Sequence, residues 1–109
     1  MEIKNAIIED VKINTENGIL SCWLYLDYGD SSHQGFGGYA LYLPKSFKHH
    51  NINSVAGHFL YRCMEIAGVS DFNAMKCKAI RVKAGDNGVE AIAHIIKDDW
   101  FNPKEDFKV

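Results

Sequence analysis

The chain has 109 residues, the size of a single domain, and its 47% hydrophobic and 24% charged residues can build a core without a disulfide or a metal. Its 12 basic and 14 acidic residues give a formal net charge of -2, which argues against a dedicated nucleic-acid-binding protein. We expect a cytoplasmic protein, because no apolar run could span a bilayer, the first residues do not resemble a signal peptide, and the three cysteines form no CxxC pair.

The first part of the chain predicts three strands. Residues 2–14 and 19–28 both alternate between apolar and polar side chains, as strands do. The Asn17-Gly18 pair between them is the strongest short signal for a hairpin, because both central residues of a type I′ turn have positive φ. In the first strand, one face carries Ile3, Ile7, Val11 and Ile13. A third, glycine-rich strand is expected over residues 35–43, ended by Pro44, because proline cannot donate to a sheet ladder.

The second part predicts one helix and a second hairpin. Residues 54–67 carry apolar side chains at helical spacing, and Gly68 stands where a left-handed C-terminal cap belongs. Strands over 77–84 and 89–97 are joined by another Asn-Gly turn, and a final turn at 98–103 folds two aromatic residues back onto the domain. The order β-β-β-α-β-β predicts a single α+β domain over residues 1–109. It is an antiparallel sheet of about five strands with one main helix on one face. How the two hairpins join in the sheet stays open.

The segment Gly35-Phe36-Gly37-Gly38 is costly, because each glycine loses about 0.5–1 kcal/mol in a strand relative to alanine. One interpretation is an exposed backbone whose N–H groups bind an anion or a peptide edge. The favoured interpretation is structural: a β-bulge, or a patch without side chains on which Trp23 or Tyr25 lies flat. The segment does not match GxGxxG, and no GK[ST] follows it, so a nucleotide-phosphate loop is not expected.

No catalytic site, cofactor or metal centre is predicted. The histidines follow no standard zinc spacing, and His94, in an apolar strand, is interpreted as a core residue with satisfied ring nitrogens. Cys22 and Cys63 lie on apolar faces, where thiols are buried and unreactive. The acidic pairs are interpreted as solvated, whereas acid–base chemistry needs carboxylates whose pKa values are separated by burial.

Two surfaces remain as binding candidates. The first combines an aromatic face, a polar loop and the glycine segment, and its residues are Trp23, Tyr25, Asp27, Tyr28, Gln34, Gly35, Phe36, Gly37, Gly38 and Tyr39. An exposed aromatic patch usually marks a partner site or a homodimer interface, unless Trp100-Phe101 covers it. The second is a basic group comprising Lys76, Lys78, Arg81 and Lys83. It is either a nucleic-acid surface or, as we favour, a solvated edge strand whose lysines discourage strand addition.

Three segments of the chain resemble a group of short proteins encoded by tailed bacteriophages and prophages. They read WLYLDYG at 23–29, QGFGGY at 34–39 and KDDWFNP at 97–103. The group's pattern, WLxLDYG…QGFGGYxL…KDxWFxP, covers most of the length. The resemblance implies a phage origin and action inside an infected bacterium, and it supplies no catalytic residues to transfer. Small accessory phage proteins of this kind include inhibitors of host defence systems.

The leading hypothesis is therefore a small non-enzymatic binding protein of phage or prophage origin. It would bind a host macromolecule or a signalling molecule and so inhibit a host defence system. The alternative is an accessory protein of phage DNA metabolism that binds nucleic acid through the basic strand. A small-molecule hydrolase using His94 is a third and weaker hypothesis. No membrane partner is expected, and a homodimer stays open.

Overall fold

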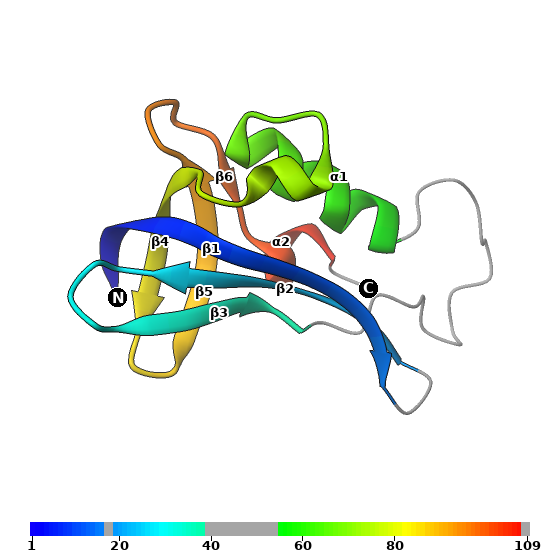
Figure 1. Ribbon diagram of the computed structural model, residues 1–109, viewed down its shortest axis with the longest axis horizontal. Coiled ribbons are helices and arrows are strands. Elements are labelled where there is room, and N and C mark those ends of the chain that lie inside the picture. Colours follow the sequence, from blue (N-terminus) through cyan, green and yellow to red (C-terminus); the bar gives the residue numbers. More distant parts are fainter. Residues whose placement is uncertain (17–18, 39–54, 108–109) are drawn as a thin grey trace.

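The computed structural model describes residues 1–16, 19–38 and 55–107, which form one antiparallel sheet with a helix packed on one face (Figure 1). The strands are β1 (Glu2–Glu16), β2 (Ile19–Asp27), β3 (His33–Gly37), β4 (Ala79–Gly85), β5 (Gly88–His94) and β6 (Trp100–Phe101). The helices are α1 (Val55–Ala67), the 3₁₀ turn η1 (Phe72–Met75) and the short α2 (Pro103–Asp106). The predicted α+β fold is confirmed, but the sheet has six strands because Trp100 and Phe101 pair with β5.

The central strand β1 pairs with different partners along its two halves. The sheet order is β3-β2-β1-β4-β5-β6, with residues 2–7 of β1 beside β4 and residues 7–16 beside β2. Between Ile8 and Asp10 the register with β2 shifts, so Glu9 is an extra residue with no partner opposite it in β2. Such a bulge bends and twists its strand. Accordingly, β2 and β3 run across β4 and β5 rather than alongside them (Figure 1).

Both predicted hairpins are present, joined through β1. The first pairs β1 with β2 as far as Glu16 opposite Ile19, and its predicted turn at 17–18 lies outside the described residues. The second pairs β4 with β5 as far as Gly85 opposite Gly88. The third strand is observed only at His33–Gly37, because its predicted continuation to Leu43 also lies outside the described residues.

The apolar alternation of β1 did not mark the core face correctly. Ala6 and Ile8 are buried, whereas the odd-numbered isoleucines are exposed: Ile3, Ile7 and Ile13. Past the bulge the parity of the strand reverses, so Val11 packs against the core. The residues of one parity therefore do not share one face: Ile3 and Ile7 lie on the outer side, whereas Val11 and Ile13 stand opposite the buried Leu24 and Cys22. A bulge cannot be recognised from alternation alone.

Helix α1 confirms the helix predicted over 54–67. Its buried residues Phe59, Cys63 and Ile66 follow helical spacing and face the sheet. Gly68 has φ +73°, and its N–H donates to the Glu65 carbonyl oxygen at 3.1 Å, which forms the predicted left-handed cap. The predicted N-terminal cap, Asn53 or Ser54, lies outside the described residues. None of the described helices is both long and apolar enough to span a membrane.

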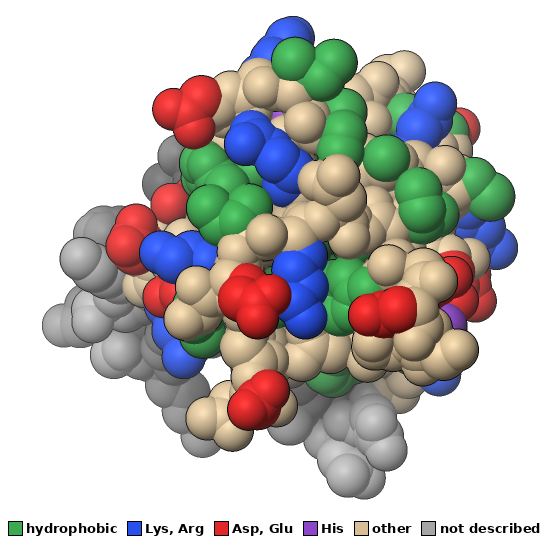
Figure 2. Space-filling view, turned by 90° about the vertical axis from the view of Figure 1, so that its left-hand side faces the viewer, with side chains coloured by type: hydrophobic (Ala, Val, Ile, Leu, Met, Phe, Trp, Pro, Cys, Tyr) green, Lys and Arg blue, Asp and Glu red, His purple; other side chains and the backbone are tan. Residues whose placement is uncertain are grey.

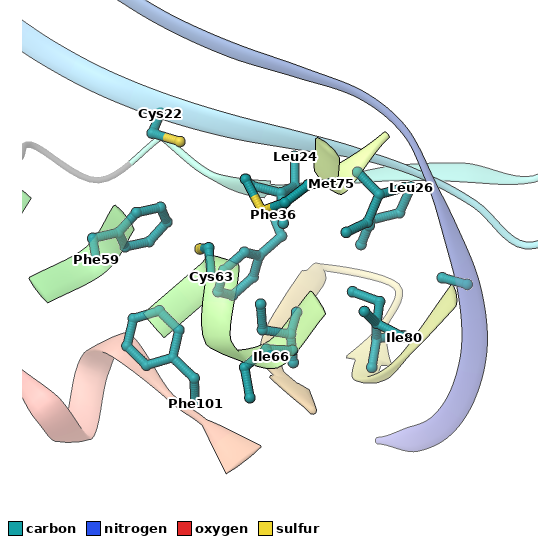
Figure 3. Close-up of a cluster of buried hydrophobic side chains, with 14 of the residues drawn as sticks. Cys22, Leu24, Leu26, Phe36, Phe59, Cys63, Ile66, Met75, Ile80 and Phe101 are labelled. Carbon is teal, nitrogen blue, oxygen red and sulfur yellow. The ribbon is translucent and has the colours of Figure 1, made fainter. Parts of the chain in front are cut away.

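Three phenylalanines from distant segments meet in the core. Phe36 of β3 stacks on Phe59 of α1 with ring centroids 5.8 Å apart, and Phe101 of β6 meets both rings edge-on. Figure 3 shows Phe36 pointing into the cluster between strands and helix. Aromatic pairs of this kind contribute about 0.5–1.5 kcal/mol each beyond their buried area. The cluster therefore ties β3, α1 and the C-terminal segment into one core.

A polar cluster fixes the C-terminal segment to α1. The Arg62 guanidinium donates to Asp99 Oδ1 at 2.9 Å and to the Trp100 carbonyl oxygen at 3.0 Å, pairs with Glu65, and lies over the Phe101 ring. The Arg62 side chain is only 17% exposed. Its hydrogen bond lowers the pKa of the Asp99 carboxyl below the ordinary value.

We expect Asp99 to stabilise the fold above its ordinary pKa of about 3.8. Because the folded-state pKa is lowered, this contribution is lost as the pH falls through the folded value. Urea unfolding at pH 7 should show Asp99→Asn to be about 0.5–1 kcal/mol less stable than the wild type, and the difference should vanish as the pH falls below the lowered folded-state pKa. The variant Asp98→Asn removes a neighbouring carboxylate outside the Arg62 cluster and should show no such pH-dependent difference. A loss for Asp99→Asn that persists at the acid end would contradict the assignment.

Candidate functional site

The predicted aromatic residues lie on the face of the sheet that points away from α1. Along β2, Trp23 and Tyr25 alternate with core residues, so their side chains point to the opposite side. Cross-strand partners share a face, and the register therefore defines an outer face of three rows. The rows are Lys12, Trp23 and Gly37; Asp10, Tyr25 and Gly35; and Ile7, Asp27 and His33.

The Trp23 ring lies flat on the glycines of β3. A Cβ at Gly35 would lie 2.9 Å from the ring, and a Cβ at Gly38 would lie 2.2 Å from it. The third glycine, Gly37, has φ +123°, and its Cβ would meet the Cys22 carbonyl oxygen at 2.1 Å. The Gly38 N–H donates to that same oxygen at 2.8 Å, so it is used within the sheet. The glycine patch beneath a tryptophan, our favoured interpretation, is confirmed.

The candidate partner-binding residues do not gather on one surface. Trp23, Tyr25 and Asp27 share the outer face, with the glycines beneath the tryptophan ring. Phe36 is completely buried in the core, so its assignment to a contact surface was wrong. Tyr39 lies outside the described residues. Tyr28 and Gln34 instead line a hollow at the end of the sheet.

This hollow has a volume of ≈580 Å³ and lies between the β2–β3 turn and the β4–β5 hairpin. The Tyr28 hydroxyl donates to Gln34 Oε1 at 2.6 Å, and Gln34 Nε2 donates to the Gly85 carbonyl oxygen at 2.9 Å. Burial raises the pKa of Tyr28. Figure 2 shows charges of both signs interspersed with hydrophobic side chains at the end of the molecule that holds the N-terminus. The Tyr28–Gln34–Gly85 chain therefore closes the bent sheet by linking β3 to β4–β5.

Trp100 does not cover the outer-face aromatics, because β6 lies at the far edge of the sheet from β3. It pairs with Ala93 and lies under the Arg81 guanidinium, 5.4 Å from the ring centroid. Arg81 also donates to the carbonyl oxygens of His94 and Lys97, at 3.0 and 2.7 Å. Arg81 is thus occupied in holding the turn after β5.

Of the remaining basic residues, Lys83 shares the outer face of β4 with Arg81. The favoured interpretation of an edge strand was wrong, because β4 is an interior strand that pairs with β1 on one side and β5 on the other. Lys76 makes an ion pair with Asp10 at 3.1 Å, and the Lys76 hydrogen bond is the main reason why the pKa of Asp10 is lowered. Lys78 and Lys83 are exposed. Because two of the four cations already have protein partners, the group offers a phosphate backbone fewer charges than its sequence indicates.

Cys22, Cys63 and His94 have structural roles in the fold. Cys22 and Cys63 are buried, and burial raises the pKa of the Cys22 thiol to about 12. The ring of His94 is half-buried, and its Nδ1 accepts from the backbone N–H groups of Ile96 and Lys97 at 3.1 Å. His94 therefore caps a turn and is not fully buried, although its Nδ1 is satisfied as predicted.

The structure also brings together three residues that the sequence did not connect. Glu9, Asp27 and His33 come from the bulge in β1, the end of β2 and the start of β3. Their potential ligand atoms all lie within 4.8 Å of one another. Among the described residues, this is the one group of three or more such side chains that could hold a metal ion. No spacing rule points to it, because the set depends on strand register and on the bulge.

The steric role of the glycine patch can be tested with two alanine variants. Gly37 and Gly88 have similar φ angles, +123° and +130°, so alanine costs each about 1–2 kcal/mol in backbone strain. Only at Gly37 would the added Cβ meet backbone, whereas at Gly88 nothing lies within 4 Å. Chemical denaturation should show Gly37→Ala to be less stable than Gly88→Ala by at least about 2 kcal/mol. Equal losses would contradict a close approach of β3 to β2.

Comparison with known proteins adds no assignment to this geometry. The chain matches no protein-family model, no curated protein and no solved structure. Among the surfaces described above, the outer face combines the exposed Tyr25 with the half-buried Trp23, which the glycine patch supports.

Proposed function

We propose that this chain is a non-enzymatic binding protein that engages a protein partner through the outer face of β1, β2 and β3. The observation that supports this is the adjacent pair Trp23 and Tyr25, which no described element covers. Tyr25 is 36% exposed, and Trp23 is half-buried by its own glycine patch. Aromatic side chains are enriched among the residues that dominate protein–protein binding energy.

The glycine patch fixes the position of the Trp23 ring before a partner binds. A tryptophan ring that already lies against Gly35 and Gly38 has little rotamer freedom left to lose when a partner arrives. Immobilising a flexible side chain on binding costs about 0.5–1.5 kcal/mol, so a fixed ring avoids part of that cost. Under this proposal Gly35 and Gly38, beneath the ring, serve both packing and recognition.

The charges around the aromatic pair favour a protein partner over a nucleic acid. Lys12 stands opposite Trp23 in β1, while Asp10 stands opposite Tyr25 and already pairs with Lys76. Glu9 lines a shallow hollow with Tyr25 and Asp10. A rim of both signs around aromatic residues is typical of protein interfaces, whereas phosphate backbones require a concentrated positive surface.

The resemblance to short phage proteins supports an infected bacterium as the place where this binding occurs. Under this proposal the partner is a protein of the bacterial host, and binding inhibits a host defence system. A flat, rigid sheet face suits inhibition by occupation of a partner's surface, since it requires no chemistry and no movement of the inhibitor.

We expect Tyr25→Ala to weaken partner binding at least tenfold, as loss of a central aromatic contact usually does. Tyr61→Ala is the matched control, because Tyr61 is a 65% exposed tyrosine on α1, away from the outer face. Wild type and both variants should be used as baits in lysate of phage-infected bacteria, with recovered proteins quantified by mass spectrometry. A partner recovered by wild type and Tyr61→Ala but not by Tyr25→Ala supports the proposal.

The same variants can be tested in cells. Expression of the wild type should raise phage plating on a strain that carries the sensitive defence system, and Tyr25→Ala should reduce that effect. Equal recovery of every protein by all three baits would overturn the proposal. Recovery that depends on nucleic acid and falls steeply with salt would favour the DNA-binding alternative instead.

A further inference from the structure

We propose that Glu9, Asp27 and His33 form a binding site for a divalent first-row transition ion such as Zn²⁺. Their potential ligand atoms lie within 4.8 Å of one another, and His33 Nδ1 is 3.1 Å from Glu9 Oε1. Each ligand comes from a different strand of three adjacent strands, so the rigid sheet holds their backbones in place. No spacing along the chain predicts this site, because its ligands meet only across the sheet.

The bulge in β1 allows this arrangement. In a regular strand, successive residues point to opposite faces. Here Asp10 stands opposite Tyr25 on the outer face, and the extra residue Glu9 also reaches the outer side, where its carboxylate meets His33 across β2. Bulges commonly re-aim a side chain beside a functional site. Asp27, on the strand between them, is oriented by the Gly29 N–H, which donates to its Oδ1 at 2.8 Å.

The donor set selects the kind of ion. One imidazole nitrogen with two carboxylates suits Zn²⁺ and its neighbours in the first transition row, whereas Ca²⁺ and Mg²⁺ prefer sites made only of oxygen. Ligands about 2.0–2.2 Å from a tetrahedral ion lie roughly 3.3–3.6 Å apart, so the His33–Glu9 pair at 3.1 Å must open slightly and the wider separations in the cluster must close. His33 and Glu9 are 52% and 42% exposed and can turn at low cost. Three protein ligands leave at least one position open towards solvent.

A second histidine–carboxylate pair, His58 with Asp106, provides a control that distinguishes a metal site from a simple ion pair. His58 Nε2 lies 2.9 Å from Asp106 Oδ2, and both side chains are about as exposed as those of His33 and Glu9. Among the described residues, this pair has no third ligand close enough to complete a site. His58 therefore matches His33 in exposure and in having a carboxylate partner but lacks the third ligand, and its ring also packs against Phe101 and Phe107.

The test is calorimetric titration of ZnCl₂ into the full chain carrying Cys77→Ser, which removes an exposed thiol that could bind zinc itself. We expect one equivalent of Zn²⁺ to bind. Adding His33→Ala or Asp27→Asn should weaken the affinity at least about tenfold, since even outer-shell changes cost about 10–100-fold, whereas His58→Ala should leave it unchanged. Far-ultraviolet circular dichroism should confirm that each variant is folded.

A measurement that resolves single residues distinguishes zinc bound at His33 from zinc bound elsewhere on the chain. In NMR spectra of the same protein, Zn²⁺ should shift the ring resonances of His33 at one equivalent and leave those of His58 in place. Undiminished affinity in His33→Ala, an equal loss in His58→Ala, or no binding up to about 1 mM Zn²⁺ would each overturn the proposal.

Discussion

The fold depends on a single strand that serves two different partners in turn. Over its first residues β1 pairs with β4, and over its remainder it pairs with β2, so the two stretches share only Ile7. The bulge at Glu9 lies just beyond this point and bends the strand there. A straight β1 would leave two hairpins side by side in a flat sheet. The bent strand instead turns one hairpin across the other, and the space between them becomes the core.

The bend explains why residues far apart in sequence meet. It brings β3 into contact with β5, and the Gln34 side chain binds the Gly85 carbonyl oxygen at the end of β4, which completes the enclosure. Phe36 can then stack on Phe59, and Phe101 closes the aromatic cluster from the C-terminal side. Arg62 holds that last segment to α1 through Asp99 and the Trp100 carbonyl oxygen, where hydrophobic contact alone would leave a two-residue strand weakly attached.

The features that could be predicted from the sequence are those that local chemistry determines. Asn-Gly turns between alternating runs predicted both strand pairings, and apolar spacing with Gly68 predicted α1. The cost of the glycines correctly indicated that a large ring lies against Gly35 and Gly38, while Gly37 is required by the close Cys22 carbonyl oxygen. The faces of β1 could not be predicted, because one extra residue reverses the parity, and β6 exists only through its pairing with β5. The Glu9–His33 contact spans 24 positions and depends on that same bulge.

The proposed binding surface and the proposed metal site are neighbours for a physical reason. The displacement at the bulge sets the rows of the outer face, so Asp10 lies opposite Tyr25 while Glu9 reaches towards Asp27 and His33. Tyr25 and Glu9 then line one shallow hollow of ≈400 Å³. An ion bound by Glu9, Asp27 and His33 would share Glu9 with this hollow and so lie close to a partner docked on Trp23 and Tyr25. A carboxylate or imidazole of that partner could complete the coordination, and recognition would then depend on shape and on metal together.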